Sequence, residues 1–385
     1  MSAYLDHAAT TPVRREARHA VLEVLDAGLG NPSGAHRGAR AARRILEEAR
    51  EEVAAVLGAR PGEVVFTSGG TEADNLAVLG RHDRVGGVLV CTAVEHHAVL
   101  DPVRSRGGRV VGVDARGVVD LDQLASALDD TVTLVSVMGV NNEIGVVQPL
   151  VEVAALVAAH APRAVLHTDA VQAVAWLPAA ATLAPAHLAS VSGHKVGGPA
   201  GIGALVVRDG IDLAPRTLGG GQERGRRSGT QDVAGAAGLA AALRATAAEL
   251  DATVTRVAAR RDRLAAALAA AIDGLVETGV GADAGGGPDR SHKVAGSCHV
   301  CIPGVDSEAL LFLLDQAGVA ASAASSCASG ALEPSHVLAA LGIPDELARG
   351  SLRLSLGATT TDAEIDHAVA VIPEAVARLR RHAGG

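Results

Sequence analysis

The chain has 385 residues, of which 48% are hydrophobic and 1% are aromatic, and its formal net charge is −9. This length can bury a large core and suits two or three domains. The acidic balance and the scarcity of aromatic rings argue against direct nucleic-acid binding and against attachment to an anionic membrane. Four cysteines are too few for a disulfide framework, so we expect a cytoplasmic protein without a signal peptide or a membrane-spanning run.

Short apolar runs alternate with helical patterns through the first half of the chain. Helices are expected over residues 13–29 and 39–57. An uninterrupted apolar run between helices is typical of a parallel strand that is covered on both faces of its sheet. Seven runs have this character: 64–66, 88–90, 110–113, 134–137, 165–167, 188–191 and 204–207. The pattern predicts an α/β fold with a mostly parallel, seven-stranded sheet.

The alternation stops after residue 207. A glycine-rich polar loop at 219–230 precedes an Ala-rich helix over about 233–272. The remainder has strand-like runs at 298–302 and 351–356, and helices are expected near 307–317, 335–341 and 361–382. We therefore predict a large domain over residues 15–251 and a smaller α/β domain formed by 1–14 and 252–385.

Polar residues follow five of the predicted strands where each strand ends. Ligands of parallel sheets bind beyond these carboxyl ends, next to helix N-termini. Gly69 and Gly70 lead into a helix at Thr71, whose free N–H groups favour an anion, although an ordinary helix cap leaves the same pattern. The other polar residues are Glu95, His96, His97, Asn141, Asn142, Asp169, Gln172, Ser192, His194 and Lys195. Because five strand ends carry such residues, we expect one shared site.

Lys195 and Asp169 indicate the chemistry of this site. A lysine forms a Schiff base with a carbonyl cofactor once its amine loses its proton. A carboxylate against a pyridine nitrogen keeps that nitrogen protonated, so that the ring can withdraw electrons. Taken singly, the two residues also suit a surface lysine and a helix-capping aspartate. Together with an anion site they indicate pyridoxal 5′-phosphate.

Several motifs resemble those of a known family along nearly the whole chain. They are residues 66–72 (FTSGGTE), 140–145 (VNNEIG), 192–195 (SGHK), 227–230 (RSGT) and 332–335 (LEPS). The chain is in this respect similar to the pyridoxal-phosphate-dependent cysteine desulfurases of the NifS/IscS type, within the class V aminotransferases. The resemblance implies the aspartate aminotransferase-like transferase fold, fold type I, with the cofactor in the large domain.

The same resemblance implies a role for each candidate residue. Lys195 would carry the cofactor, Asp169 would pair with its ring nitrogen, and His96 would stack on the ring and share in proton transfer. Further cofactor contacts would come from Gly70, Thr71, Gln172, Ser192 and His194, and from Thr230 of a second subunit, which implies a homodimer. Asn142 and Arg353 would position the substrate L-cysteine, with Arg353 forking its carboxylate.

The resemblance makes Cys327 the nucleophile, on a loop over about 321–332. Its thiolate would take the sulfur of L-cysteine as a persulfide, L-alanine would leave, and an acceptor protein would receive the sulfur. Iron–sulfur assembly, tRNA thiolation and DNA phosphorothioation all stay open as destinations. The alternative functions are a selenocysteine lyase or aminotransferase of the same fold, and a non-enzymatic sulfur-relay scaffold.

Cys298 and Cys301 form a CxxC pair that is half of a typical zinc site. Zinc takes four ligands in structural sites, and residues three apart on a strand face opposite sides. We therefore interpret both cysteines, and Cys91 in an apolar run, as core residues, and we expect no metal site.

Overall fold

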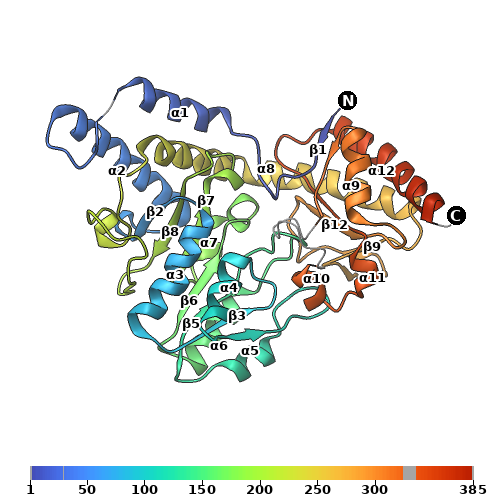
Figure 1. Cartoon of the computed structure of the whole chain (residues 1–385), viewed down its shortest axis with the longest axis horizontal. Helices are drawn as coiled ribbons and strands as arrows, with labels where there is room; N and C mark the ends of the chain where they lie inside the picture. The colour runs from blue at the N-terminus through green and yellow to red at the C-terminus, as the bar shows by residue number, and fades with distance from the viewer. Residues whose placement is uncertain (1, 29, 324–334, 384–385) are drawn as a thin grey trace.

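The computed structural model describes residues 2–28, 30–323 and 335–383, and Figure 1 shows how their helices and strands are arranged. Two sheets lie toward opposite ends of this view, and helix α8 (Val233–Ala271) runs between them. The predicted nucleophile, Cys327, lies outside the described residues.

The larger sheet has seven strands in the order β2-β8-β7-β6-β5-β3-β4. All pair in parallel except β8, which is antiparallel to both β2 and β7. The strands are β2 (Val64–Thr67), β3 (Val88–Thr92), β4 (Arg109–Val111), β5 (Val132–Ser136), β6 (Val165–Asp169), β7 (Leu188–Ser192) and β8 (Gly203–Val207). Each predicted apolar run is one of these strands, so the mostly parallel seven-stranded sheet is confirmed.

Helices cover both faces of this sheet, because successive strand residues point to opposite sides. Val64 and Phe66 pack with side chains of α2 and α8, whereas Val65 packs with side chains of α3 and α4. The helices around this sheet are α1 (Arg15–Asp26), α2 (Arg37–Leu57), α3 (Gly70–Val85), α4 (His97–Ser105), α5 (Leu121–Ala127), α6 (Leu150–His160) and α7 (Ala179–Leu183). Helix α1 is shorter than predicted because Arg14 is extended and Gly28 has a φ of 57°.

The smaller sheet has three antiparallel strands in the order β14-β12-β9. They are β9 (Val276–Glu277), β12 (Ser297–Cys301) and β14 (Ser351–Ser355), accompanied by α9 (Ser307–Gln316), α10 (His336–Ala340), α11 (Asp345–Ala348) and α12 (Asp362–Ala383). Two strand pairs complete the fold: β1 (Ala3–Tyr4) with β13 (Val319–Ala320), and β10 (Gly281–Ala282) with β11 (Pro288–Asp289). The first pair fastens the N-terminus beside the smaller sheet (Figure 1).

Three of the cysteines are core residues, as the sequence predicted. Cys298 and Cys301 point to opposite sides of β12 into two different hydrophobic clusters, and Cys91 is buried beneath α3 and α4. Burial raises the pKa of Cys298 and of Cys301 to about 12, so both thiols stay protonated. The described residues hold no group of three or more His, Cys, Asp or Glu side chains that could bind a metal.

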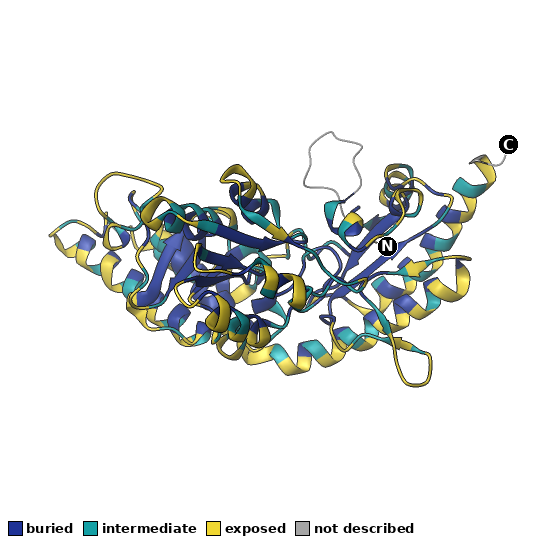
Figure 2. Cartoon of the chain, turned by 90° about the horizontal axis from the view of Figure 1, so that it is seen from below, coloured by how far each residue is buried: buried dark blue, intermediate teal, exposed yellow. Residues whose placement is uncertain are grey.

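Helix α8 links the two ends of the molecule, packing against α1 and α2 in one half and α12 in the other. Within the described chain it is the one helix long and apolar enough, by length and composition, to cross a membrane, whereas the sequence was expected to hold no such run. Half of its most apolar segment is buried in the structure, and Figure 2 shows how burial is distributed over the chain. The predicted domain boundary at residue 251 falls inside this continuous helix, and the division into two domains stays a prediction.

Candidate active site

A cavity of about 320 Å³ lies at the carboxyl ends of β6 and β7. Its wall contains nearly all of the cofactor and substrate residues proposed from the sequence: Gly70, Thr71, His96, Asn142, Asp169, Gln172, Ser192, His194, Lys195 and Arg353. The N-terminal arm, residues 5–12, closes the cavity with Asp6, Ala8 and Ala9. A second cavity of about 330 Å³ adjoins it, and Lys195 and Arg353 line both.

Lys195 ends a short 3₁₀ turn, Gly193–Lys195, directly after β7. The turn brings the side chain back over the edge of the sheet and toward the arm. The amine donates to the backbone oxygens of Ala8 at 2.6 Å and Ala9 at 2.8 Å. The lysine therefore stands inside the cavity, within reach of a ligand bound there.

Asp169 is the last residue of β6 and is 5% exposed. One carboxylate oxygen accepts a hydrogen bond from the N–H of Val171 at 2.9 Å, which fixes the orientation of the group. Burial raises the pKa of Asp169, while the nearby His96 and Lys195 act in the opposite direction. A protonated ring nitrogen beside this carboxylate would favour its ionised form further.

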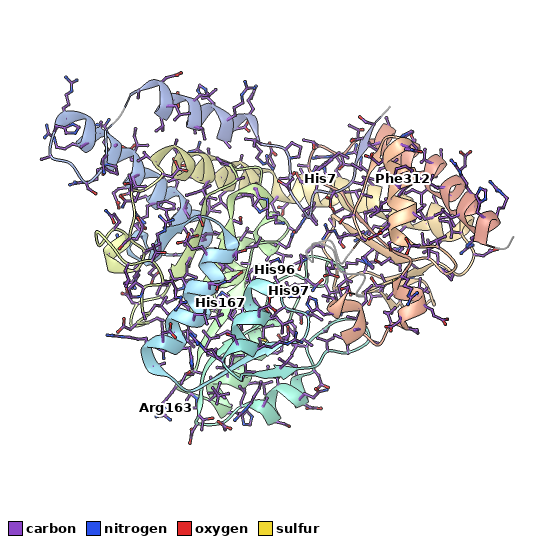
Figure 3. All side chains as sticks on the ribbon, viewed as in Figure 1. His7, His96, His97, Arg163, His167 and Phe312 are labelled. Carbon is purple, nitrogen blue, oxygen red and sulfur yellow. The ribbon has the colours of Figure 1, made fainter. Side chains whose placement is uncertain are left out.

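His96 caps the N-terminus of α4, and its Nδ1 accepts from the N–H of Ala98 at 3.1 Å. This bond fixes the ring at the cavity wall, and burial lowers the pKa of His96, so the neutral imidazole is favoured. His97, labelled with His96 in Figure 3, instead lies beside Asp101, 3.2 Å away, and against the ring of His336. The pair of histidines is thus divided, with His96 in the cavity wall and His97 outside it.

The N-terminus of α3 provides the features of an anion site. The first N–H groups of a helix lack intrahelical partners and carry the positive end of its dipole. At Gly70 a Cβ atom would approach Val171 Cγ2 to 2.7 Å, so a larger residue would force the Val171 side chain to move. Burial lowers the pKa of His194 to about 4, so near neutral pH it is an uncharged hydrogen-bonding partner at this end of the cavity.

Arg353 reaches the cavity from β14, on the smaller sheet. Its Nη2 donates to Asp6 at 3.0 Å, and its Nη1 donates to the backbone oxygen of Asn142 at 3.2 Å. Its Nε is buried and has no hydrogen-bond acceptor among the described residues. A buried donor without an acceptor is costly, so an anionic ligand would complete this group.

Three predicted residues differ from the rest in their placement. Thr230 is exposed on the glycine-rich loop and does not line the cavity of its own chain, a position that leaves open its predicted contact with a second subunit. Gln172 lines the cavity, but its amide donates to the backbone oxygen of Ala8 at 2.9 Å. Cys327 cannot be placed because it lies outside the described residues.

Sequence reasoning missed Asp74, which also lines the cavity. It lies one turn after Gly70 on α3, so the helical spacing was a signal that the site extends along this face. Asp74 is 1% exposed, and its Oδ1 lies 3.5 Å from His167 Nε2 without a hydrogen bond. Burial, with the nearby Asp169, raises the pKa of Asp74, and burial lowers the pKa of His167 to about 3. Burial therefore disfavours the charged form of both groups.

The residues present fit pyridoxal 5′-phosphate: an amine, a buried carboxylate, an imidazole and a helix N-terminus surround one cavity. Together with the sheet topology they define a pyridoxal-phosphate enzyme of the α/β class. The sequence profile of the family described as aminotransferase class-V matches residues 3–368. The chain belongs to this family, which confirms the resemblance, the fold class and the cofactor expected from the sequence.

Individual relatives are similar over almost the whole chain. An IscS-like cysteine desulfurase of Mycobacterium tuberculosis is 45% identical, with 99% of this chain and 98% of the relative covered. A solved NifS-like protein has a TM-score of 0.89 and 32% identity, with 98% of this chain and all of that one covered. The crystal structure of DndA from Streptomyces lividans has a TM-score of 0.74 and 36% identity, covering 90% of this chain and 97% of that one.

Proposed function

We propose that the chain is a pyridoxal-phosphate-dependent cysteine desulfurase that converts L-cysteine to L-alanine and transfers the sulfur. The enzyme class agrees with that of the relatives. The observation that carries the proposal is the convergence of Lys195, Asp169 and Arg353 on one cavity from two different sheets.

Each residue of the cavity has a separate role that follows from its position. When bound, pyridoxal phosphate withdraws electrons from the substrate carbon that carries the amine. Asp169 would hold the proton on the ring nitrogen, and His96 would stack on the ring. Arg353 binds the substrate carboxylate with its free N–H groups, beside Asn142. Lys195, whose amine lies in the cavity, would hold the cofactor and move the proton at the substrate α-carbon.

Cys327 takes the sulfur. Its thiolate attacks the sulfur of the bound cysteine, an S–S bond forms, and the bond between that sulfur and the substrate β-carbon breaks with its electron pair left on the carbon. That carbon then takes a proton and leaves as L-alanine, while Cys327 keeps the persulfide for an acceptor. This role rests on the sequence motif alone.

We further propose that the enzyme acts in the cytoplasm as a homodimer in which Thr230 contacts the partner's cofactor. The exposed position of Thr230 supports this arrangement. Among the three sulfur destinations we favour DNA phosphorothioation, because we expect this use for a DndA-type enzyme. The similarity of the chain to DndA supports this choice. Iron–sulfur assembly is the main alternative, given the IscS-like relative.

The substitution Cys327→Ser tests this function. We expect the variant to bind pyridoxal phosphate and to change its visible spectrum when L-cysteine is added, because every cavity residue is intact. Alanine production should stop, because a serine hydroxyl is not ionised near neutral pH and cannot hold a persulfide. Alanine release at the wild-type rate would instead identify a lyase or aminotransferase. A purified protein without any visible absorbance band would indicate the scaffold.

A further inference from the structure

Arg353 is held on both sides by groups that are distant in sequence. Asp6 accepts from Nη2 and the backbone oxygen of Asn142 accepts from Nη1. The Arg353 side chain is 6% exposed and that of Asp6 is 23% exposed. Each terminal nitrogen carries two hydrogens, so one on each remains for a further acceptor.

The backbone around Asp6 is fixed against the strand that carries Arg353. Ser355, two residues beyond Arg353, donates its N–H to Leu5 at 2.7 Å and accepts from the N–H of His7 at 3.2 Å. Its hydroxyl accepts from the N–H of Ala8 at 2.8 Å. Strand β1 adds its own pairing with β13. The Asp6 carboxylate is therefore a rigid anchor, not a mobile surface charge.

We propose that Asp6 is a positioning residue of the substrate site, aiming the guanidinium of Arg353 at the carboxylate of the amino acid. This inference rests on the proposed function. Asp6 and Asn142 take one hydrogen from each terminal nitrogen, and the remaining hydrogens, together with the unpaired Nε, stay available to a carboxylate. A guanidinium held in this way does not have to be ordered when the substrate arrives, a cost that a free arginine side chain carries.

The negative charge of Asp6 also repels a carboxylate, and the two effects oppose each other. Asp6 is partly exposed, so water screens this repulsion. The hydrogen bond depends on geometry and is not screened in the same way. Positioning therefore outweighs repulsion, and the acceptor oxygen matters more than the charge.

The experiment measures ligand binding to the pyridoxal-phosphate-loaded enzyme from the change in its visible spectrum. The ligands are L-alanine, which has a carboxylate, and cysteamine, which lacks one. Asp6→Ala should raise the Kd for L-alanine about tenfold and leave that for cysteamine unchanged. Asp6→Asn should stay within about threefold of the wild type for both ligands, because its amide oxygen accepts the same hydrogen bond.

Two further variants make the outcome unambiguous. Asp362→Ala removes an aspartate that pairs with Arg260 at 2.7 Å and does not line the cavity, and it should bind both ligands as the wild type does. Arg353→Met should weaken L-alanine binding more than Asp6→Ala, and if it does not, the proposed substrate site is wrong. The positioning role alone is overturned if Arg353→Met acts as expected but Asp6→Ala leaves L-alanine binding unchanged or tighter. It is also overturned if Asp6→Ala weakens the binding of cysteamine and L-alanine equally.

Discussion

The wall of the cavity that belongs to the seven-stranded sheet differs from the wall formed by the N-terminal arm and β14. The first is built from strand ends and the helix N-termini that follow them, so each functional group lies within a few residues of its own element. In the second, the contacting residues are far apart in sequence: Asp6 and Arg353 are separated by 347 positions. The residues that we propose for the cofactor lie in the local wall, and the arginine that we propose for the substrate carboxylate belongs to the long-range one.

This difference has a chemical consequence. A cofactor that stays bound through many turnovers suits groups fixed by rigid local structure. The substrate arrives and leaves in each cycle, and the arginine that meets it is assembled by packing one part of the chain against another. The comparison predicts that substitutions in the local wall change the cofactor, whereas those in the long-range wall change substrate affinity.

The largest effect is expected for Lys195→Ala in the local wall. The variant should lose both turnover and the visible absorbance band of the lysine-bound cofactor, because no other described lysine lines this cavity. Absorbance spectra of the purified variant and assays of alanine release check this. An intact band would contradict the assignment of the cofactor to the local wall, since the cofactor would then be bound elsewhere.

The next effect concerns Asp169. Asp169→Asn keeps the shape of the side chain but removes the charge that holds the proton on the cofactor ring. We expect kcat to fall by a factor on the order of 10²–10³, while the melting temperature stays close to that of the wild type. Kinetics of the cofactor-loaded variant provide the measurement, and a wild-type rate would count against the role.

Asp74→Asn is the matched control, because both aspartates are buried and line the same cavity. Burial raises the pKa of Asp74 and so favours its uncharged carboxyl, and no cation is among the causes of its shift, whereas His96 and Lys195 oppose the rise at Asp169. Replacing it by a neutral amide should therefore change kcat by no more than about threefold. Equal losses in the two variants would mean that Asp74 shares the charge now assigned to Asp169.

The sequence predicted the local wall well, because strands and strand ends are recognised from residues that are close together in the sequence. Seven apolar runs located the strands, and polar residues just beyond them located Asp169, Ser192 and Lys195. The helices α5, α7 and α11 were missed because they have only four to seven residues and show little periodicity. Asp6 was noticed only as part of an extended arm, since no spacing in the sequence indicates that it meets Arg353. Long-range pairing of this kind depends on how the two sheets pack.

A last test concerns the stability of the turn that carries Glu143, next to Asn142 of the cavity. The Glu143 side chain, in the turn after Asn142, accepts a hydrogen bond from Ser335 at the start of α10. Burial raises the pKa of Glu143 from 4.5 to about 7. Folding therefore favours the protonated carboxyl, so this contribution to stability is complete below pH 4.5 and is lost as the pH rises toward 7.

Glu143→Gln should remove this dependence, because an amide does not ionise and its oxygen still accepts from Ser335. Between pH 5 and 8 we expect the wild type to lose roughly 2–3 kcal/mol of unfolding free energy relative to the variant, as given by urea midpoints. If the two curves run parallel across this range, Glu143 is ionised in the folded protein, and the turn beside Asn142 is more open to water than its burial implies.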